Sequence, residues 1–307
     1  MSSQTLNIGV LGAGRIGRVH AANLATRISG ARVLAVADPI EEAAQRCAHD
    51  FGIPAALTDY RAVLANPDIE AVLICTATDT HAQISEEAAQ AGKQIFCEKP
   101  IALSLATIDR ALAAVERAGV TLQIGFNRRF DANFRRVRQA IVQGEIGTPE
   151  LLHIISRDPA PPPISYIKVS GGIFVDMTIH DFDMARFLVG SEVDEVYVAG
   201  AVMVDPAIGE AGDIDTALTV LRFANGAIGT IDNSRRAVYG YDQRVEVFGS
   251  GGAIAVSNNY PNNTTISDAN SIRRDLPLNF FMDRYTESFV AELSEFVGAV
   301  TGGAPVP

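Results

Sequence analysis

Short hydrophobic runs alternate with longer Ala-rich amphipathic segments over roughly the first 125 residues. The runs that predict strands are Leu6–Leu11, Arg32–Ala37, Ala71–Thr76, Gln94–Glu98 and Thr121–Gly125. The segments of helical length between them are Ile16–Leu24, Glu41–Phe51, His81–Ala91 and Ser104–Ala118. This alternation is typical of βαβ units. It predicts an α/β domain with a doubly wound parallel sheet over residues 1–125.

The pattern changes after Gly147–Pro149, where a strand-like run, Glu150–Ser156, leads into a Pro-rich loop and a helical stretch that ends near Leu188. From Val193 onward, alternating runs predict antiparallel strands. Asn225-Gly226 between two such runs is a strong hairpin signal, because both turn residues must tolerate positive φ. The runs that predict hairpins and the closing helical repeat are Ala217–Ala224 with Ala227–Asp232, Arg244–Phe248 with Ala253–Val256, and Arg284–Val300. We therefore expect residues 126–307 to form an α+β domain with a large open, mainly antiparallel sheet.

Composition excludes several classes of protein. With 48% hydrophobic and 20% charged residues, the 307-residue chain is expected to fold as a globular protein. No apolar run approaches the roughly 18 residues that a membrane span needs, and the start, Met1–Asn7, lacks a secretory pattern. We expect a soluble cytoplasmic protein with no membrane partner. The formal charge of −11 argues against nucleic acid as a partner. The basic residues that cluster are Arg128, Arg129, Arg135, Arg136 and Arg138.

The first predicted strand runs directly into Gly12-Ala-Gly14-Arg-Ile-Gly17, which opens a helix, and Asp38 closes the second strand. This GxGxxG pattern in a βαβ context predicts a dinucleotide site on a Rossmann-type domain, with the pyrophosphate at the helix N-terminus. Asp38 can accept hydrogen bonds from ribose hydroxyls and would repel a 2′-phosphate, so NAD is favoured over NADP.

Lys99 follows the strand Gln94–Glu98, at the edge of an open α/β sheet where ligands bind. The chain has only two other lysines, Lys93 and Lys168. An ammonium group at this edge can stabilise the alkoxide that develops as a hydroxyl carbon loses hydride. The alternative is that Lys99 pairs with Glu98 or extends to the surface.

Asp176, His180 and Asp183 are four and three residues apart, so on a helix they project from one stripe. A histidine beside carboxylates is a plausible general base. One alternative is that Asp176 caps a helix beside a half-buried histidine. We expect no metal, because the sequence has no further His or Cys at ligand spacing, and Cys47, Cys75 and Cys97 are widely spaced.

Taken together, the glycine loop, Asp38, Glu98-Lys99-Pro100 and Gly171-Gly172 with Asp176 and His180 resemble the Gfo/Idh/MocA family of NAD(P)-dependent sugar and polyol dehydrogenases. The stretches that are similar to its inositol 2-dehydrogenase branch are Gly125–Asp131, Asp176–Phe187 and Asn233–Gly249. This resemblance implies NAD-dependent oxidation of myo-inositol to 2-keto-myo-inositol, in a homotetramer that assembles through the open sheet. Relatives usually continue into a further helix, so we expect the family's final helix to be absent or truncated.

The resemblance also implies a role for individual residues. The catalytic group would be Lys99, Asp176 and His180. In this group His180 would take the hydroxyl proton, Asp176 would orient and support His180, and Lys99 would hold the reacting oxygen. The implied substrate contacts are Lys99, Arg129, Asp176, His180, Asp183 and Tyr239. The expected cofactor contacts are Gly12, Ala13, Gly14, Arg15, Ile16, Gly17, Asp38, Thr76, His81, Glu98 and Asn127. Arg128 and Arg129 could instead be solvated charges that flank a helix.

The sequence also bears on alternative functions. No tyrosine has a lysine four residues on, which disfavours a short-chain dehydrogenase, and every cysteine lies in the first 100 or so residues, which disfavours a zinc alcohol dehydrogenase. Within the family, the substrate could be scyllo-inositol, chiro-inositol or an aldose, since the loop Arg157–Val169 should border the pocket. A non-catalytic NAD(H) sensor is the alternative from another class.

Overall fold

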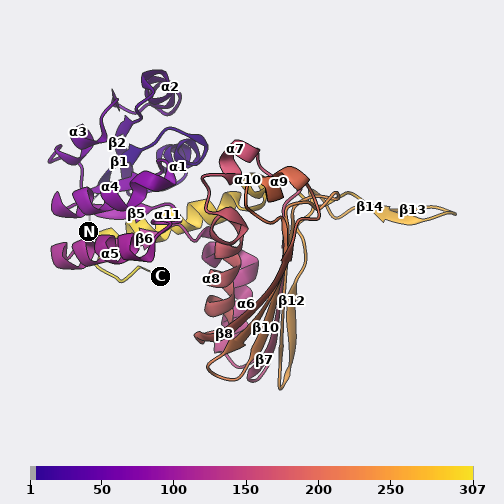
Figure 1. Cartoon of the computed structure of the whole chain (residues 1–307). Coiled ribbons are helices and arrows are strands. Elements are labelled where there is room, and N and C mark those ends of the chain that lie inside the picture. The colour runs from indigo at the N-terminus through magenta and orange to yellow at the C-terminus, as the bar shows by residue number, and fades with distance from the viewer. Residues whose placement is uncertain (1–4, 307) are drawn as a thin grey trace. The chain divides into compact units, whose positions relative to one another are not determined.

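The computed structural model describes residues 5–306, which divide into two compact units. One unit extends to Asn127 and is completed by the chain from Glu287 onward, and the other is Arg128–Thr286. The first unit contains a six-stranded parallel sheet (Figure 1). Its strands, in spatial order, are β3 (Ala55–Leu57), β2 (Ala31–Ala37), β1 (Leu6–Leu11), β4 (Ala71–Ile74), β5 (Gln94–Cys97) and β6 (Leu122–Ile124).

The strands of the first unit are rich in branched apolar residues because helices cover both faces of the sheet. The helices are α1 (Arg15–Thr26), α2 (Glu41–Phe51), α3 (Tyr60–Leu64), α4 (Thr78–Gln90), α5 (Leu105–Ala118) and α11 (Thr286–Gly302). The strand order 3-2-1-4-5-6 is that of a Rossmann domain, so the predicted fold class is confirmed. The carboxyl ends of β1, β2, β4 and β5 carry the glycine loop, Asp38, Thr76 and Glu98-Lys99.

Helix α11 packs into the core of the first unit. Leu293, Phe296 and Val297 belong to the same buried cluster as Val10 and Phe96 of the sheet. The structure therefore differs from the expected division at residues 125 and 126, which assigned the whole remaining chain to the second domain. The reason is that the periodic apolar face of this helix is complementary to the Rossmann core, a long-range contact that periodicity along one segment does not reveal.

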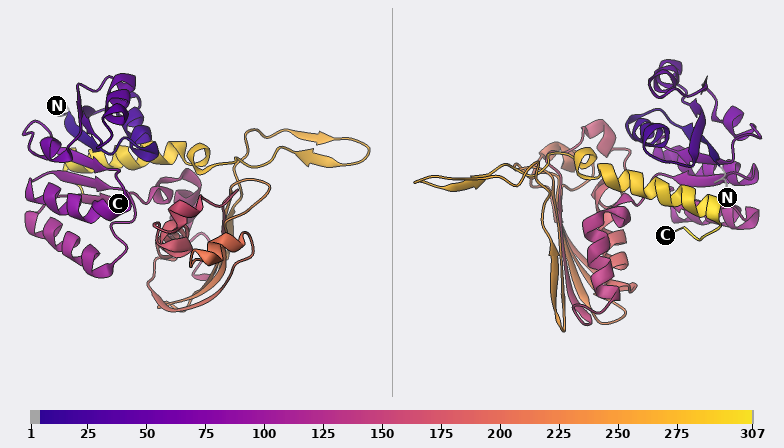
Figure 2. Two further views of the ribbon diagram at one scale, coloured as in Figure 1. Left: turned by 45° about the horizontal axis from the view of Figure 1, so that its top comes forward. Right: turned by 180° about the vertical axis from the view of Figure 1, so that it is seen from behind.

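The second unit is built on a six-stranded mixed sheet that is open on one face (Figure 2). Its strands, in spatial order, are β12 (Gly252–Val256), β11 (Asp242–Gly249), β7 (Pro149–Arg157), β10 (Ile228–Ser234), β9 (Thr216–Phe223) and β8 (Val193–Ala201). All pairs are antiparallel except β7 with β10. Helices α6 (Ala132–Val142) and α8 (Ile179–Val189) lie against the other face. The mainly antiparallel sheet is as expected.

Several elements of the second unit had no prediction. They are the 3₁₀ turn η1 (Asn127–Phe130), which starts at the unit boundary, the helices α6, α7 (Ile164–Ile167), α9 (Pro206–Glu210) and α10 (Phe281–Arg284), and the ribbon β13 (Thr265–Ser267) with β14 (Ile272–Arg274). The helical stretch before Leu188 is also not uniform, because Phe174–Thr178 forms a π-helical turn, η2. The expected α-helical stripe through Asp176 and His180 therefore crosses a junction between π and α geometry.

Among the described residues, no helix is both long and apolar enough to cross a membrane. The first four residues, part of the segment Met1–Asn7 that lacks a secretory pattern, lie outside the described part of the chain.

Candidate functional site

The glycine loop between β1 and α1 has the geometry that a pyrophosphate site requires. Gly12 has φ of +98°, and a Cβ there would lie 2.4 Å from the carbonyl oxygen of Cys75. A Cβ on Gly14 would meet nothing within 4 Å, so the backbone is open to a ligand at this point. Gly14 is the N-cap of α1 and supplies no side-chain cap, which leaves the first amides of the helix to bind an anion. The described residues thus fit a dinucleotide.

Asp38 lies beside this loop. One carboxylate oxygen accepts from the backbone N–H of Ala13 at 2.7 Å, and the other accepts from Ile40 N–H at 2.9 Å. A carboxylate has about four acceptor sites, so it can still accept from ribose hydroxyls. Of the remaining predicted loop residues, Arg15 is exposed and Ile16 packs against the hydrophobic core. The structure therefore gives Ile16 a packing role.

The edge formed by β4 and β5 is organised by two histidines. The ring nitrogens of His81 lie 2.8 Å from the Pro100 carbonyl oxygen and 3.0 Å from that of Thr76, so this buried side chain ties the loop after β4 to the loop that carries Lys99. Glu98 lies 2.6 Å from Nε2 of the fully buried His20. Lys99 is half-buried and follows Glu98 directly in the chain. The predicted contacts thus gather at one sheet edge.

Two buried groups of this unit were missed by the sequence analysis. His20 lies on α1, and its ring packs edge-on against Phe96 and Phe289, with centroid distances of 5.4 and 5.7 Å. Glu292, on α11, is 0% exposed, and neither carboxyl oxygen has a hydrogen-bond partner among the described residues. Burial, and then the nearby charge of Glu98, raise the pKa of Glu292 well above its ordinary value. The one signal in the sequence that could have pointed to Glu292 is its position as a charged residue within the apolar helical repeat Arg284–Val300.

A hollow of about 600 Å³ lies at the opposite edge of the same sheet, where the strands begin. Its lining includes Leu6, Glu70, Lys93 and Val300. No predicted site residue contributes to it. Lys93 is 6% exposed, and its ammonium group donates to the carbonyls of Asn66 and Ile69, both at 2.8 Å. This lysine therefore serves the packing of the loop before β4, and the hollow is separate from the candidate site.

In the second unit, the π turn η2 presents Asp176. One carboxylate oxygen accepts from the hydroxyl of Tyr166 at 2.9 Å, and the other accepts from Nη1 of Arg235 at 3.1 Å. The alternative in which Asp176 caps a helix has no support, since η2 has no side-chain cap. π turns interrupt helices often at functional sites. His180 follows in the first turn of α8 and is half-buried.

Arg129 and Asp183, both predicted substrate contacts, bind one another. The guanidinium donates to both carboxylate oxygens, at distances from 2.6 to 3.1 Å. Arg128, 5% exposed, forms a separate pair in which Nη1 lies 2.5 Å from Asp181 Oδ1. The alternative in which Arg128 and Arg129 are solvated charges is therefore wrong: each neutralises a carboxylate of α8. Between them, they fix that helix against η1.

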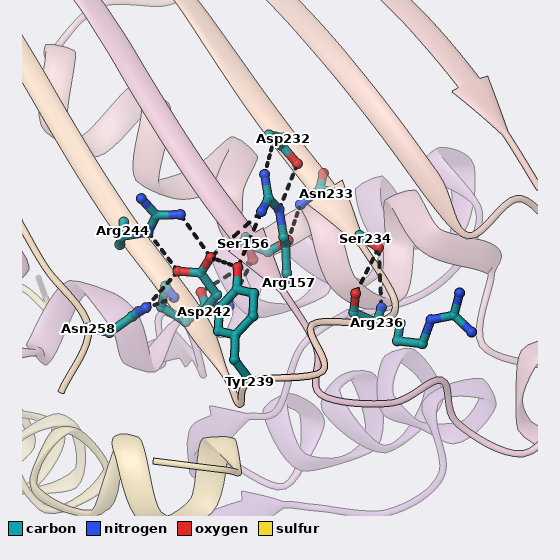
Figure 3. A network of polar contacts seen from close by, with 11 residues as sticks. Ser156, Arg157, Asp232, Asn233, Ser234, Arg236, Tyr239, Asp242, Arg244 and Asn258 are labelled. Atoms are coloured by element: carbon teal, nitrogen blue, oxygen red, sulfur yellow. Dashed lines mark hydrogen bonds and ion pairs between the residues drawn. The ribbon is translucent and has the colours of Figure 1, made fainter. Parts of the chain in front are cut away.

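Tyr239, the remaining predicted substrate contact, belongs to a polar network at the end of the open sheet (Figure 3). Its hydroxyl donates to Asp242 at 2.5 Å and accepts from Arg157 at 3.2 Å. Arg157 also pairs with Asp232, and Asp242 accepts from Arg244 at 2.7 Å. Burial, followed by the hydrogen bond to Asp242, raises the pKa of Tyr239. The hydroxyl is thus held in a fixed orientation.

One further carboxyl group lies near Asp176. Asp158 follows β7 at the start of the Pro-rich loop. Burial raises the pKa of Asp158 to about 6, an effect that the positive charge of Arg235 opposes and the negative charge of Asp176 reinforces. A carboxyl group that titrates near neutrality is a feature of functional sites. The Pro-rich loop was predicted from the sequence to border the pocket, but Asp158 itself was not predicted.

No group of three or more His, Cys, Asp or Glu side chains that could hold a metal ion occurs within residues 5–306. The three cysteines are buried and free of disulfides.

A Rossmann unit with an open glycine loop and an acid at the end of β2, joined to a unit that presents His and Asp side chains, defines the class of nicotinamide-dependent oxidoreductases. Matches to two family models agree with this class of protein. Residues 6–126 match the oxidoreductase family with an NAD-binding Rossmann fold, and residues 134–255 match the GFO/IDH/MocA C-terminal domain. The chain belongs to the Gfo/Idh/MocA oxidoreductase family, and its cofactor is NAD.

Curated relatives span nearly the whole chain. The chain is 50% identical over 299 residues to an uncharacterised oxidoreductase, YrbE, of Bacillus subtilis, which covers 97% of this chain and 87% of that protein. It is 49% identical to the myo-inositol 2-dehydrogenase of Thermotoga maritima, with 98% and 90% covered. It is likewise 49% identical to the inositol 2-dehydrogenase of Rhizobium meliloti, with 98% and 91% covered.

Solved structures show the same fold. A probable dehydrogenase from Thermotoga maritima matches with a TM-score of 0.96 at 49% identity, covering 98% of this chain and 90% of that one. The scyllo-inositol dehydrogenase of Lactobacillus casei, solved with NAD(H) and scyllo-inositol, matches with a TM-score of 0.92 at 30% identity, covering 99% and 91%.

Proposed function

We propose that this protein oxidises one hydroxyl of a cyclic polyol to a ketone with NAD⁺, and that its substrate is myo-inositol, which gives 2-keto-myo-inositol (scyllo-inosose). The observation that carries this proposal is the 49% identity, over 98% of the chain, to a myo-inositol 2-dehydrogenase. Scyllo-inositol is the second candidate, because a relative with the same fold binds it. A cyclic polyol offers only hydroxyl groups, so its site needs side chains that donate and accept.

The catalytic group of this proposal is Lys99, Asp176 and His180. The glycine loop and Asp38 would hold NAD⁺, which would supply the acceptor for the hydride from the carbon that carries the reacting hydroxyl. His180 takes the hydroxyl proton, and the fixed carboxylate of Asp176 stabilises the resulting imidazolium. The ammonium group of Lys99 holds the reacting oxygen while negative charge develops on it. The positions of Lys99 at the carboxyl end of β5 and of Asp176 on η2 support these roles.

The substrate contacts of this proposal are Arg129, Asp183 and Tyr239. The Arg129–Asp183 pair presents a donor and an acceptor in one rigid unit, which suits a ligand whose every hydroxyl does both. The orientation of the Tyr239 hydroxyl by Arg157 and Asp242 supports a contact of fixed direction. Thr76, His81, Glu98 and Asn127 remain the proposed cofactor edge.

We also propose that the protein is a cytoplasmic homotetramer that assembles through the open face of its second sheet. Apolar side chains on this face support that assembly. Ile228, Leu151 and Phe248 are neighbours across β10, β7 and β11, and their exposed fractions are 45, 39 and 44%. Patches of this kind commonly mark interfaces between chains.

The test is NADH formation at 340 nm by the purified protein, with NAD⁺ or NADP⁺, against a panel of polyols led by myo-inositol and including scyllo-inositol, chiro-inositol and aldoses. We expect turnover with myo-inositol and NAD⁺. Turnover with a different polyol and none with myo-inositol would contradict the substrate assignment but not the proposed mechanism. No turnover, together with measurable NAD binding, would contradict the proposed activity and favour an NAD(H) sensor.

A further inference from the structure

Arg235 is completely buried, directly after β10, and no predicted role accounts for it. Its backbone N–H donates to the carbonyl of Asp215 at 2.8 Å. The carboxylate of Asp215 is itself fixed, because it accepts from the backbone N–H groups of Met203, Val204 and Asp205 at 2.7 to 3.0 Å. The guanidinium therefore projects from a rigid base.

Two carboxylates flank this guanidinium. Nη1 donates to Asp176 Oδ2 at 3.1 Å, and Nη2 lies 3.6 Å from Asp213 Oδ2. Among the described residues, Nη2 and Nε make no hydrogen bond, so charge attraction holds Asp213. Asp213 also accepts from the backbone N–H of Ile173 at 3.1 Å. Arg235 thus joins the end of β10, the loop after α9 and the turn that carries Asp176.

The neighbouring glycine fits this arrangement. Gly172 has φ of +77°, and a Cβ there would lie 2.7 Å from Asp213 Oδ1. The Gly171-Gly172 pair therefore allows the chain to pass over Asp213 and bring Ile173 N–H to it. This is a physical reason for two glycines before Asp176.

A buried guanidinium requires carboxylate partners, because an unpaired buried charge is strongly unfavourable. This requirement acts in both directions. Arg235 cannot move away from Asp176, and one oxygen of Asp176 cannot turn away from Arg235. The other oxygen is held by Tyr166, whose side chain is 48% exposed and lies on the short helix α7. The buried contact is thus the fixed one of the two.

We propose that Arg235 is a positioning residue of the active site: by bridging Asp176 and Asp213, it fixes the carboxylate that supports His180. This inference rests on the proposed function and adds to it a residue that acts only through Asp176. Arg235 contacts the reacting groups through that carboxylate and is not itself a catalytic residue. The bridge explains why a fully buried arginine follows strand β10.

The test compares steady-state kinetics of wild type, Arg235→Gln and Arg235→Lys. We expect Arg235→Gln to lower kcat about 10- to 100-fold, as the misplacement of a catalytic group does, while KM for NAD⁺ stays unchanged. Arg235→Lys keeps a cation and should recover most of kcat. Unchanged kcat in Arg235→Gln, or a lysine variant as defective as the glutamine variant, would overturn the proposal.

Arg284→Gln is the matched control, because it removes another buried arginine of the same unit from its carboxylate, Asp131. We expect lower stability in this variant but wild-type kcat per folded molecule. If Arg235→Gln fails to fold, the double variant Arg235→Gln/Asp213→Asn removes the stranded carboxylate. The same loss of kcat is expected there, and a wild-type kcat would refute the bridge.

A measurement without turnover separates this inference from the proposed function. Chemical unfolding of wild type, Arg235→Gln, Asp176→Asn and Arg235→Gln/Asp176→Asn gives a double-mutant cycle. We expect non-additive losses, since the two side chains are in contact. Additive losses would contradict the bridge even in an active enzyme, whereas inactivity of the wild type on every polyol would contradict only the proposed function.

Discussion

At the residue scale, the candidate catalytic side chains are fixed by contacts from remote parts of the chain. His20 binds Glu98, one residue before Lys99, from a position 78 residues away in sequence. Arg235 binds Asp176 across 59 residues. Such contacts hold a side chain in one orientation before substrate arrives, which is how a site acquires reactivity from ordinary residue types. A substitution of Arg235, which contacts Asp176, should therefore affect the rate more than the affinity for the cofactor.

His180→Ala should lower kcat about 10²- to 10⁴-fold, the usual contribution of a positioned acid or base, because the hydroxyl proton then has no acceptor. Steady-state NADH formation with the best polyol measures this. His49→Ala is the control, since that side chain is 88% exposed on α2. A near-normal kcat in His180→Ala would remove His180 from the mechanism.

Asp38→Ala should relax the preference for NAD over NADP, because it removes the negative charge that repels a 2′-phosphate. The measurement is the ratio of kcat/KM for the two cofactors. Asp38→Asn should relax it as well while keeping an acceptor for Ala13 N–H. Asp109→Ala, at an exposed position of α5, is the control. Equal use of both cofactors by the wild type would contradict the argument.

At the element scale, β1 and α2 have the predicted bounds, because their hydrophobic patterns are complete within one segment. The glycine loop and Asp38 were equally predictable, since backbone geometry restricts the residue type. The π turn at Asp176 was not predictable, because a single extra residue in a helix leaves no periodic signal. The packing of α11 and the position of Arg235 depend on long-range contacts. One sequence does not show its partners across such distances.

The pair Arg128–Asp181 joins η1 to α8, and Asn233 of β10 also donates to Asp181 at 2.8 Å. Arg128→Met should lower the free energy of unfolding by about 3–5 kcal/mol, because it leaves a buried carboxylate without its cation. Urea unfolding measures the loss. The double variant Arg128→Met/Asp181→Asn should lose less than the single variant. An equal loss in both would show that the stranded charge is not the cause.

Glu292 makes the stability of the first unit depend on pH. Its pKa is raised in the folded state, so between the ordinary value of 4.5 and the folded value the unfolded chain releases a proton that the folded chain keeps. Stability therefore falls as pH rises through this window, by up to about 1.4 kcal/mol per pH unit. Glu292→Gln has no proton to release, so it should gain stability over wild type from pH 4.5 upward.

Chemical unfolding of both proteins from pH 4.5 to pH 8.5 tests this. Glu287→Gln on the same helix is the control, because its side chain is 80% exposed and its pair with Arg27 lies at the surface. That variant should follow the wild-type curve. Parallel curves for Glu292→Gln and wild type would mean that Glu292 does not hold a proton in the folded state.

At the scale of the whole molecule, the residues proposed for catalysis and cofactor binding come from two units of the chain. The described residues place the glycine loop, Asp38 and Lys99 in the first unit, and Asp176, with His180, in the second. The second unit also exposes one face of its sheet. Side chains along each strand of an open sheet point alternately to the covered and the uncovered face. Apolar residues on the uncovered face therefore need an explanation beyond the fold of one chain.

Assembly through this face predicts the effect of charge on it. Ile228→Arg combined with Phe248→Arg places two cations on the open face, on the strands β10 and β11 that flank β7, where an interface would bury them without partners. We expect light scattering after size-exclusion chromatography to give four chain masses for the wild type and a smaller assembly for this variant. Leu105→Arg with Leu112→Arg is the control, because both leucines are exposed on α5 of the other unit. A tetramer in both variants would mean that the open sheet is not the interface. A monomeric wild type would contradict the proposed homotetramer, and the exposed apolar residues of the open face would then need a different partner.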